Sequence, residues 1–342
     1  MAADSIEHMD HSRSKQSYNR FTKLAPHGAL VALAALIVLS AVLVMGLHAA
    51  DAAQGGPTPT PAATTTPEDD GPLTQADLVW FTGNVARPNG MVWLDDLIYV
   101  ICEGDKTIYK LYGTSGATDT YIYGILDAHT LYAEEDGDGN VLLWVPDYRA
   151  GKLLLITVGG VETVASALAG PWGIVPLGST NFLISDHLAG TVEFISRTGE
   201  RQTFVEGLAR PTGLEYDGSL LYVANSGASE RAIEWYELVA TRGDEPHVGD
   251  VLVRGLEDVM ALRIGPDDKL YFAYDEEGLG VIGRVDPAVC RENDGCGPDE
   301  IERVVMTDMD APLAGLTFAP DGRLFFHERY GERLYWAQAI EE

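Results

Sequence analysis

The chain has 342 residues, and its 52 Asp and Glu against 23 Lys and Arg give a formal net charge of −29 at pH 7. A surface this acidic repels phosphate backbones and anionic lipid headgroups. The composition therefore argues against nucleic-acid binding and against attachment to a membrane through charge. The length is enough to bury a large hydrophobic core.

The first predicted element is a transmembrane helix over residues 28–47. This run, GALVALAALIVLSAVLVMGL, contains no charged residue, and at about 1.5 Å per residue it spans a hydrocarbon core of roughly 30 Å. Basic residues precede it and acidic residues follow it. This asymmetry predicts a single-pass cell-membrane protein with residues 1–27 in the cytoplasm and the rest exported. A cleaved signal peptide is the alternative, with a small-residue cleavage site at Ala50 and Ala52, although the run is long for such a peptide.

A linker is predicted next, over residues 48–72. Its sequence alternates Pro and Thr (GPTPTPAATTTP) and holds nothing that builds a core. Such a composition favours a semi-extended stalk that holds the following domain, residues 73–342, away from the membrane.

One phrase recurs six times in residues 73–342: Pro-x-Gly or a variant of it, then three apolar stretches separated by turns. The third residue of the phrase is, in order, Gly90, Thr130, Gly173, Gly213, Ala261 and Gly315. The apolar stretches are short, rich in Val, Ile, Leu, Tyr and Phe, and bounded by Gly, Asp and Asn, which is typical of strands and hairpins. A further strand precedes most of the phrases. Four strands in a unit of about 40 residues predict an all-β fold, a six-bladed β-propeller with four-stranded blades.

The ends of the repeat region predict how the ring closes. The sixth unit reaches the end of the chain without a fourth strand, whereas residues 77–82 (DLVWFT) have no blade of their own. We predict that this N-terminal strand becomes the outer strand of the last blade, because an open edge between the first and last blades is thereby removed.

Two segments carry a resemblance to known families. Pro211-Thr212-Gly213-Leu214, followed by Leu220 to Ser226 (LLYVANS), resembles the NHL repeat and the senescence-marker-protein/gluconolactonase-like propellers. The last repeat, APDGRLFFHERYGERLYW, is similar to repeats of glucose/sorbosone dehydrogenases, which use pyrroloquinoline quinone. The resemblance implies a six-bladed propeller, and it is weak for activity because such folds host many functions.

The middle residue of each Pro-x-Gly is expected at one mouth of the central channel. These residues are Asn89, His129, Trp172, Thr212, Met260 and Ala314. In gluconolactonase-like proteins this position supplies metal ligands, but here the set contains no acid, and a hard divalent cation usually needs carboxylates. We therefore interpret Asn89, His129, Trp172, Thr212 and Met260 as a ligand-binding rim, with ordinary channel packing as the alternative.

A second recurring position ends the second strand of each unit and holds Glu103, Asp147, Asp186, Asn225, Asp275 and Glu328. Because an acid or Asn recurs in every blade, we predict a structural role, in which these side chains bond backbone N–H groups of the following turn. His187 and His327 are expected in equivalent places beside these turn residues, where a channel-facing His would serve as a general base.

Residues 136–140 hold a separate candidate metal site. Asp136, Asp138 and Asn140 have oxygens at calcium-loop spacing, although the flanks are strands rather than helices. An Asp-Gly hairpin explains the same residues. Ca2+ is the only cofactor that the sequence suggests.

Cys290 and Cys296 enclose a polar loop, which predicts a local disulfide in an exported domain. Cys102 lies in an apolar strand and is expected to be buried.

Two functions are compatible with these residues. The first is a membrane-anchored, extracytoplasmic module that binds a small molecule, glycan or protein. The alternative is an enzyme at the channel mouth, either a metal-dependent lactonase-like hydrolase or a sugar oxidoreductase. The absence of acids among the channel-mouth residues favours the first.

Overall fold

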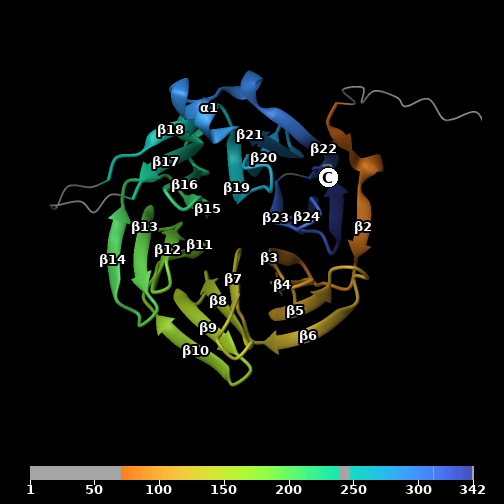
Figure 1. The fold of residues 1–342 in the computed structure, drawn as a ribbon, viewed down its shortest axis with the longest axis vertical. Coiled ribbons are helices and arrows are strands. Elements are labelled where there is room, and N and C mark those ends of the chain that lie inside the picture. Colours follow the sequence, from red (N-terminus) through yellow and green to blue (C-terminus); the bar gives the residue numbers. More distant parts are fainter. Residues whose placement is uncertain (1–70, 239–246, 311, 341–342) are drawn as a thin grey trace, which may run out of the picture. The chain divides into compact units, whose positions relative to one another are not determined.

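Six antiparallel sheets surround a central axis in the computed structural model, which describes residues 71–238, 247–310 and 312–340 (Figure 1). Each sheet is one blade, and its strands follow one another from the axis outward. The six-bladed, four-stranded architecture predicted from the repeat is therefore confirmed. The predicted span 28–47, the cytoplasmic segment 1–27 and nearly all of the linker lie outside the described residues. Among the residues that are described, no helix is long and apolar enough to cross a membrane.

The first three blades each run from an innermost strand beside the axis to an outermost strand at the rim of the ring. The first blade contains β3 (Pro88–Leu94), β4 (Leu97–Cys102), β5 (Thr107–Tyr112) and β6 (Thr118–Tyr123). The second contains β7 (Tyr132–Glu135), β8 (Val141–Asp147), β9 (Lys152–Thr157) and β10 (Gly160–Ala165). The third contains β11 (Pro171–Leu177), β12 (Asn181–Asp186), β13 (Thr191–Ser196) and β14 (Arg201–Val205).

The remaining blades follow the same order. The fourth contains β15 (Pro211–Tyr216), β16 (Leu220–Asn225), β17 (Ile233–Glu237) and β18 (Asp250–Val253). The fifth contains β19 (Glu257–Ile264), β20 (Leu270–Glu276), β21 (Leu279–Val285) and β22 (Glu302–Asp310). The sixth contains β23 (Leu313–Phe318), β24 (Arg323–Glu328) and β25 (Leu334–Gln338). The described helices are α1 (Pro287–Glu292) and the 3-10 turns Gln75–Asp77, Ser229–Arg231 and Pro298–Glu300.

The ring closes through the N-terminal strand β2 (Val79–Thr82). It pairs antiparallel with β25, with Val79 opposite Trp336, and becomes the outer strand of the sixth blade. The predicted closing strand is thus confirmed. A second N-terminal strand, β1 (Leu73–Thr74), was not predicted; it pairs in parallel with β22 and adds a fifth strand to the fifth blade. One short N-terminal segment therefore joins the fifth and sixth blades.

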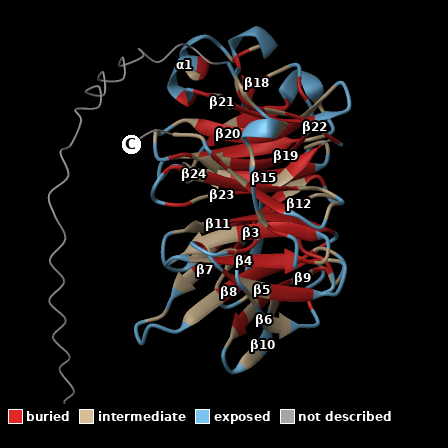
Figure 2. Cartoon of the chain, turned by 90° about the vertical axis from the view of Figure 1, so that its right-hand side faces the viewer, coloured by how far each residue is buried: buried red, intermediate tan, exposed pale blue. Residues whose placement is uncertain are grey.

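The hydrophobic core lies mainly between the facing sheets of adjacent blades (Figure 2). Trp144 of β8 and Phe182 of β12 pack across the second and third blades, with ring centroids 4.7 Å apart. Phe81 of β2 packs on Phe325 of β24 at 5.0 Å, so the closing strand also contributes to this core. Because each blade is covered by a neighbour on both faces, its strands carry apolar residues on both faces.

The glycine of the Pro-x-Gly phrase permits close approach of the innermost strands. A Cβ added at Gly90 would lie 2.5 Å from the carbonyl oxygen of His129 in the next blade. A Cβ at Gly173 would lie 2.5 Å from the carbonyl oxygen of Thr212. Because these neighbours are backbone atoms, the recurring glycine is explained by the narrowness of the channel.

The predicted disulfide joins Cys290, within α1, to Cys296, and both half-cystines are buried. Asp286 begins this helix, accepting hydrogen bonds from the backbone N–H of Ala288 and Val289. Cys102 is buried as expected, and burial raises the pKa of its thiol well above the usual range.

Candidate functional site

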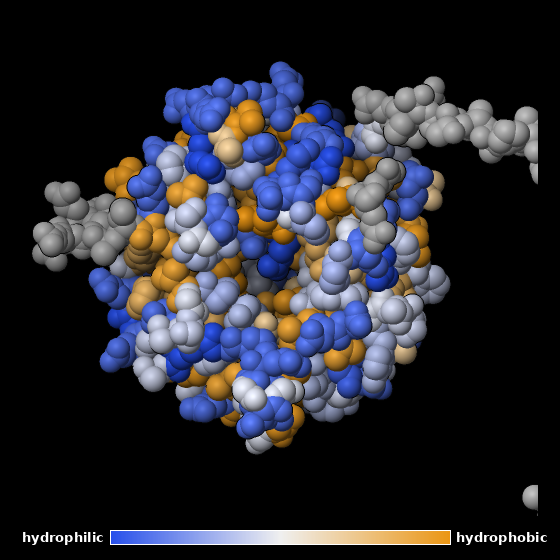
Figure 3. Space-filling view, viewed as in Figure 1, coloured by the Kyte–Doolittle hydropathy of each residue, from blue (hydrophilic) through white to orange (hydrophobic). Residues whose placement is uncertain are grey.

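The centre of the ring is hollow (Figure 3), and a pocket of about 600 Å³, including its part open to solvent, lies among the innermost strands. Four of the five predicted rim residues line this pocket: Asn89, His129, Trp172 and Met260. Ala314, at the equivalent position of the sixth blade, also lines it. Thr212 does not, because its side chain is fully buried and its hydroxyl donates to the carbonyl oxygen of Val259 at 2.6 Å.

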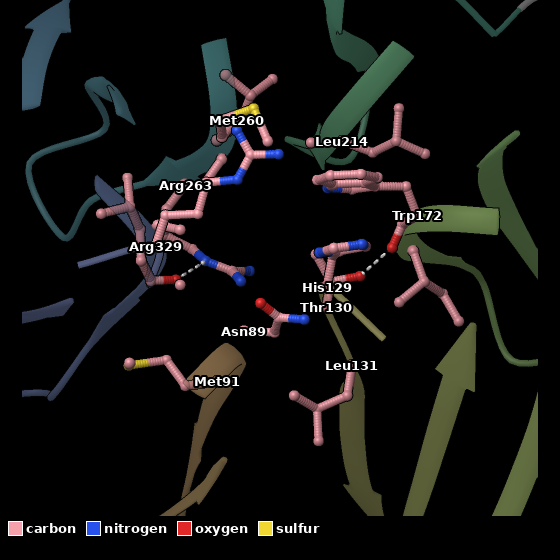
Figure 4. A pocket seen from close by; sticks show the side chains of 17 residues that line it. Asn89, Met91, His129, Thr130, Leu131, Trp172, Leu214, Met260, Arg263 and Arg329 are labelled. Carbon is pink, nitrogen blue, oxygen red and sulfur yellow. Dashed lines mark hydrogen bonds between the residues drawn. The ribbon is translucent and has the colours of Figure 1, made fainter. Parts of the chain in front are cut away.

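One wall of the pocket carries His129 and Trp172, and His187 and Tyr148 pack against these two side chains to form an aromatic stack. The rings of His129 and Trp172 are nearly parallel, with centroids 3.5 Å apart (Figure 4). His187 also stacks on Trp172 at 4.9 Å, and Tyr148 meets both His129 and Trp172 edge-on. These contacts hold four side chains from the second and third blades as one rigid surface.

The opposite wall carries two arginines, Arg263 and Arg329 (Figure 4). Neither was predicted from the sequence. The Arg263 guanidinium lies 3.2 Å from the carboxylate of Glu215 and donates to the carbonyl oxygen of Leu316. Arg329 lies over the ring of Tyr330 and forms no ion pair with any acid in the described part of the chain. The site therefore presents one guanidinium beside a carboxyl group and one without an acidic partner among the described residues.

A signal for Arg329 does exist in the repeat. It follows Glu328, just as Tyr148 follows Asp147 and His187 follows Asp186. The residue after the turn acid thus approaches the channel mouth in three blades. A comparison of this position across the repeat would have placed all three side chains at the pocket.

The histidines of the site are neutral at pH 7. Burial, with the nearby Arg329 and the other histidines, lowers the pKa of His129 to about 3. Burial also lowers the pKa of His187 and that of His327. Each neutral imidazole therefore has one N–H donor and one nitrogen that accepts a hydrogen bond. The positive charge in the pocket comes from the arginines.

One carboxyl group reaches the mouth, although no rim position holds an acid. Asp127 precedes His129 by two residues, is 7% exposed and accepts a hydrogen bond from the Asn89 side chain at 3.1 Å. It also lies 3.5 Å from Arg149 and 3.8 Å from His129. Burial, together with Glu103 nearby, raises the pKa of Asp127 to about 6 despite the arginine.

His187 and His327 are not equivalent, and this prediction was wrong. Asp186 pairs with Pro171 and Glu328 with Leu313, so His187 follows the turn residue whereas His327 precedes it. His327 is fully buried and its Nδ1 bonds the carbonyl oxygen of Glu328 at 2.8 Å. Its Nε2 has no hydrogen-bond partner among the described residues. That atom would lie 2.7 Å from a Cβ at Gly315, which lines the pocket.

The structural role predicted for the turn residues is confirmed in three blades. Asp147, Asp186 and Asp275 each accept a hydrogen bond from a backbone N–H of the following turn, at 2.7 to 3.2 Å. Asn225 instead accepts from the backbone N–H of Ala209, which precedes its blade, at 2.7 Å. Glu328 instead accepts from the hydroxyl of Tyr335.

Glu103 does not occupy the predicted position. The residue opposite Pro88 is Cys102, as Asp186 is opposite Pro171. Glu103 lies one residue further along the chain, where it pairs with Arg87 and Arg149. Glu103 therefore forms ion pairs with these two arginines and does not occupy the position of the turn residues.

The predicted calcium loop forms the hairpin between β7 and β8. Asp136 Oδ1 accepts hydrogen bonds from the backbone N–H of Asp138 and Asn140, both at 2.9 Å. None of these three residues lines the channel pocket. Calcium at this hairpin stays a prediction, and no cluster of three or more His, Cys, Asp or Glu is placed to hold a metal in the described part of the chain.

The donor set at the channel mouth does not fit a hard divalent cation. Asp127, the carboxyl group that contacts the rim residues Asn89 and His129, is already bonded to Asn89 and close to Arg149. Calcium takes six to eight oxygen ligands, several of them carboxylates. Arg263 and Arg329 would in addition repel a cation in the pocket.

Glu215, the partner of Arg263, yields a test of the electrostatics of this site. Its side chain is 13% exposed, and burial raises its pKa to about 7 from 4.5. At pH 5 the folded state holds a proton on Glu215 that the unfolded state mostly lacks. Raising the pH to 8 removes this proton, so the free energy of unfolding should fall by about 2 kcal/mol relative to that of Glu215→Gln.

Urea denaturation of both proteins at pH 5 and pH 8 measures this difference. Glu237→Gln removes an exposed glutamate from the same blade and should leave the pH dependence of the wild type unchanged. A difference between wild type and Glu215→Gln that is equal at both pH values would contradict the buried position of this carboxyl group.

Comparison with known proteins shows the fold of the chain. No family model and no curated protein matches it. A calcium-binding protein, regucalcin, from Agrobacterium tumefaciens has a TM-score of 0.58 and 13% identity, over 78% of this chain and 95% of that one. A gluconolactonase from Xanthomonas campestris has a TM-score of 0.57 and 14% identity, over 76% and 88%. A streptogramin B lyase has a TM-score of 0.52 and 15% identity, over 76% and 96%.

These similarities confirm the predicted resemblance to gluconolactonase-like propellers at the level of architecture. At such identities they show the fold alone, because propellers of one architecture carry different sites. The resemblance of the last repeat to glucose/sorbosone dehydrogenases stays a prediction.

Proposed function

We propose that this chain is a membrane-anchored, exported propeller that binds a small ligand at its channel mouth. The observation that carries the proposal is the lining of the pocket, where Arg329 lacks an acidic partner among the described residues and faces a rigid aromatic stack. A concave site with a few oriented polar groups and apolar walls is typical of small-molecule binding. The span 28–47, with its basic N-terminal flank, supports the anchor and the exported location.

A lactonase-like hydrolase is the second candidate, and one cluster favours it. Asp127, Asn89 and His129 converge at the mouth, and the raised pKa of Asp127, about 6, is that of a group able to exchange a proton near neutral pH. Gluconolactonases also share the fold. We rank this candidate second because Asp127 is close to Arg149 and already accepts the Asn89 amide.

Hydrolysis of gluconolactone by the full chain, with and without millimolar calcium, separates the two candidates. We expect no rate above that of a protein-free control. Asp127→Asn removes the carboxyl group that contacts Asn89 and His129, and Asp119→Asn, on the exposed outer strand β6, is its matched control. Turnover that is lost in Asp127→Asn and kept in Asp119→Asn would replace the binding module with the hydrolase.

A further inference from the structure

The pocket contains an uncompensated positive charge within a strongly acidic protein. Most described arginines pair with an acid, including Arg263, which lies beside Glu215. Arg329 is half-buried, lines the pocket and pairs with none of the described acids. Its sequence neighbour Glu328 is engaged by the hydroxyl of Tyr335. A half-buried guanidinium without a counter-charge is costly, and an anion in the pocket would remove that cost.

The surroundings of Arg329 are arranged to leave it free for a ligand. Arg329 lies across the pocket from His129 and Trp172 (Figure 4), and its charge contributes to the lowered pKa of His129 and of His187. Both imidazoles are neutral and do not compete with Arg329 for an anion.

The deeper wall of the pocket is apolar. Each innermost strand begins at the mouth, so the residues after the rim positions lie further inside. The residue two positions after the rim residue is a buried aliphatic or thioether side chain in all six blades: Met91, Leu131, Ile174, Leu214, Leu262 and Leu316. At the exposed rim, Leu188 and Tyr330 flank His187 and Arg329, and they are 62% and 63% exposed. A ligand with an apolar body therefore gains contacts that a bare inorganic anion does not.

We infer that the ligand of the channel mouth is a small organic carboxylate, held by Arg329 opposite the aromatic stack with its apolar body directed into the channel. This inference rests on the proposed binding function and adds the ligand class. The planar guanidinium matches a carboxylate through two parallel N–H···O bonds, which a point charge does not reproduce.

Binding of benzoate to the full chain, followed by tryptophan fluorescence, tests the inference, since Trp172 lies in the pocket wall. Benzamide has the same shape without the charge, and acetate has the charge without the ring. We expect benzoate to bind at least tenfold more tightly than either. Arg329→Gln should weaken benzoate binding at least tenfold, and Arg329→Lys should weaken it less.

Arg333→Gln is the matched control, because it removes the same charge from the sixth blade at a side chain that lies over Trp80 of the outer strand. It should bind benzoate like the wild type, and thermal melting of each variant verifies that it folds. Equal binding of benzoate and benzamide would overturn the carboxylate inference and leave the binding function standing. If none of the three probes binds, or if Arg329→Gln and Arg333→Gln bind benzoate alike, the carboxylate inference is wrong. The binding function is tested by a different experiment, the lactone assay. Lactone turnover that depends on Asp127 would contradict the binding function.

Discussion

Gly90→Ala is expected to destabilise the protein by about 3 kcal/mol or more, enough to unfold a marginally stable domain. The added methyl group would lie 2.5 Å from the carbonyl oxygen of His129 and 2.8 Å from the Cα of Thr130. Both contacts are with backbone atoms of the neighbouring blade, so no side-chain rotation relieves them. The innermost strands of the first two blades would have to separate, which disturbs the ring at its narrowest point. Urea denaturation followed by circular dichroism measures the loss.

Gly137→Ala is the control for this substitution. Gly137 lies in the hairpin between β7 and β8, has no atom within 4 Å of its built Cβ, and does not have a positive φ. Its replacement should change the free energy of unfolding by less than about 1 kcal/mol. Equal denaturation midpoints for the two variants would mean that the inner strands are not in such close contact.

Removal of the closing strand is expected to have the second large effect. A chain that starts at residue 83 lacks β1 and β2. The outer edge of β25 then has no partner strand, and the ring of Phe325, on which Phe81 packs, is uncovered. The lost contacts and ladder bonds together amount to about 3 kcal/mol or more. An exposed strand edge also promotes pairing between molecules. We expect this chain to aggregate or to lose its near-UV circular dichroism signal.

Two longer chains serve as references for the truncation. A chain that starts at residue 71 keeps both strands, and one that starts at residue 78 keeps β2 but loses the parallel contact of β1 with β22. The first should behave like the intact domain, and the second should melt at a somewhat lower temperature. A monomeric chain 83–342 that melts within a few degrees of chain 71–342 would show that ring closure by β2 is dispensable.

The architecture was predictable because a repeat encodes it. Six phrases at similar spacing predicted six blades, and the strand missing from the last unit predicted its replacement at residues 77–82, of which 79–82 form β2. The two-residue strand β1 carries no comparable signal. It has two residues and pairs with a strand more than 200 residues away, and short segments of this kind are common outside strands.

The site was predictable only in part, and register explains the errors. A β-bulge lies between Pro88 and Gly90, and another between Pro171 and Ile174. Counting along the sequence cannot reveal such an insertion, and a shift of one residue exchanges neighbouring positions. Glu103 was confused with the turn residues because the position opposite Pro88 holds Cys102, and the nearest acid lies one residue further along the chain. Asn89, His129, Trp172 and Met260 do line the channel pocket, and their role in ligand binding stays a prediction.

The arginine wall was missed for a different reason. The repeat marks the position of Arg329, which follows a turn acid as Tyr148 and His187 do, but the side chains at this position differ in type, so the repeat does not predict an arginine there. Arg263 lies at no recurring position. What distinguishes the two arginines is which carboxylates lie near them in the fold. Glu215 lies beside Arg263, whereas none of the described acids pairs with Arg329. Charge compensation is a property of three-dimensional neighbours and is not visible in composition.

The pairing of β2 with β25 has a consequence for the order of events during synthesis. The ribosome makes Val79 before any complete blade and makes its partner Trp336 after almost everything else. Throughout elongation the first strand has no partner, and each newly made blade leaves an unpaired edge. The pairing of β2 with β25 is therefore the last contact of the ring that can form. A chain in the course of synthesis depends on protection of these edges until its final residues emerge.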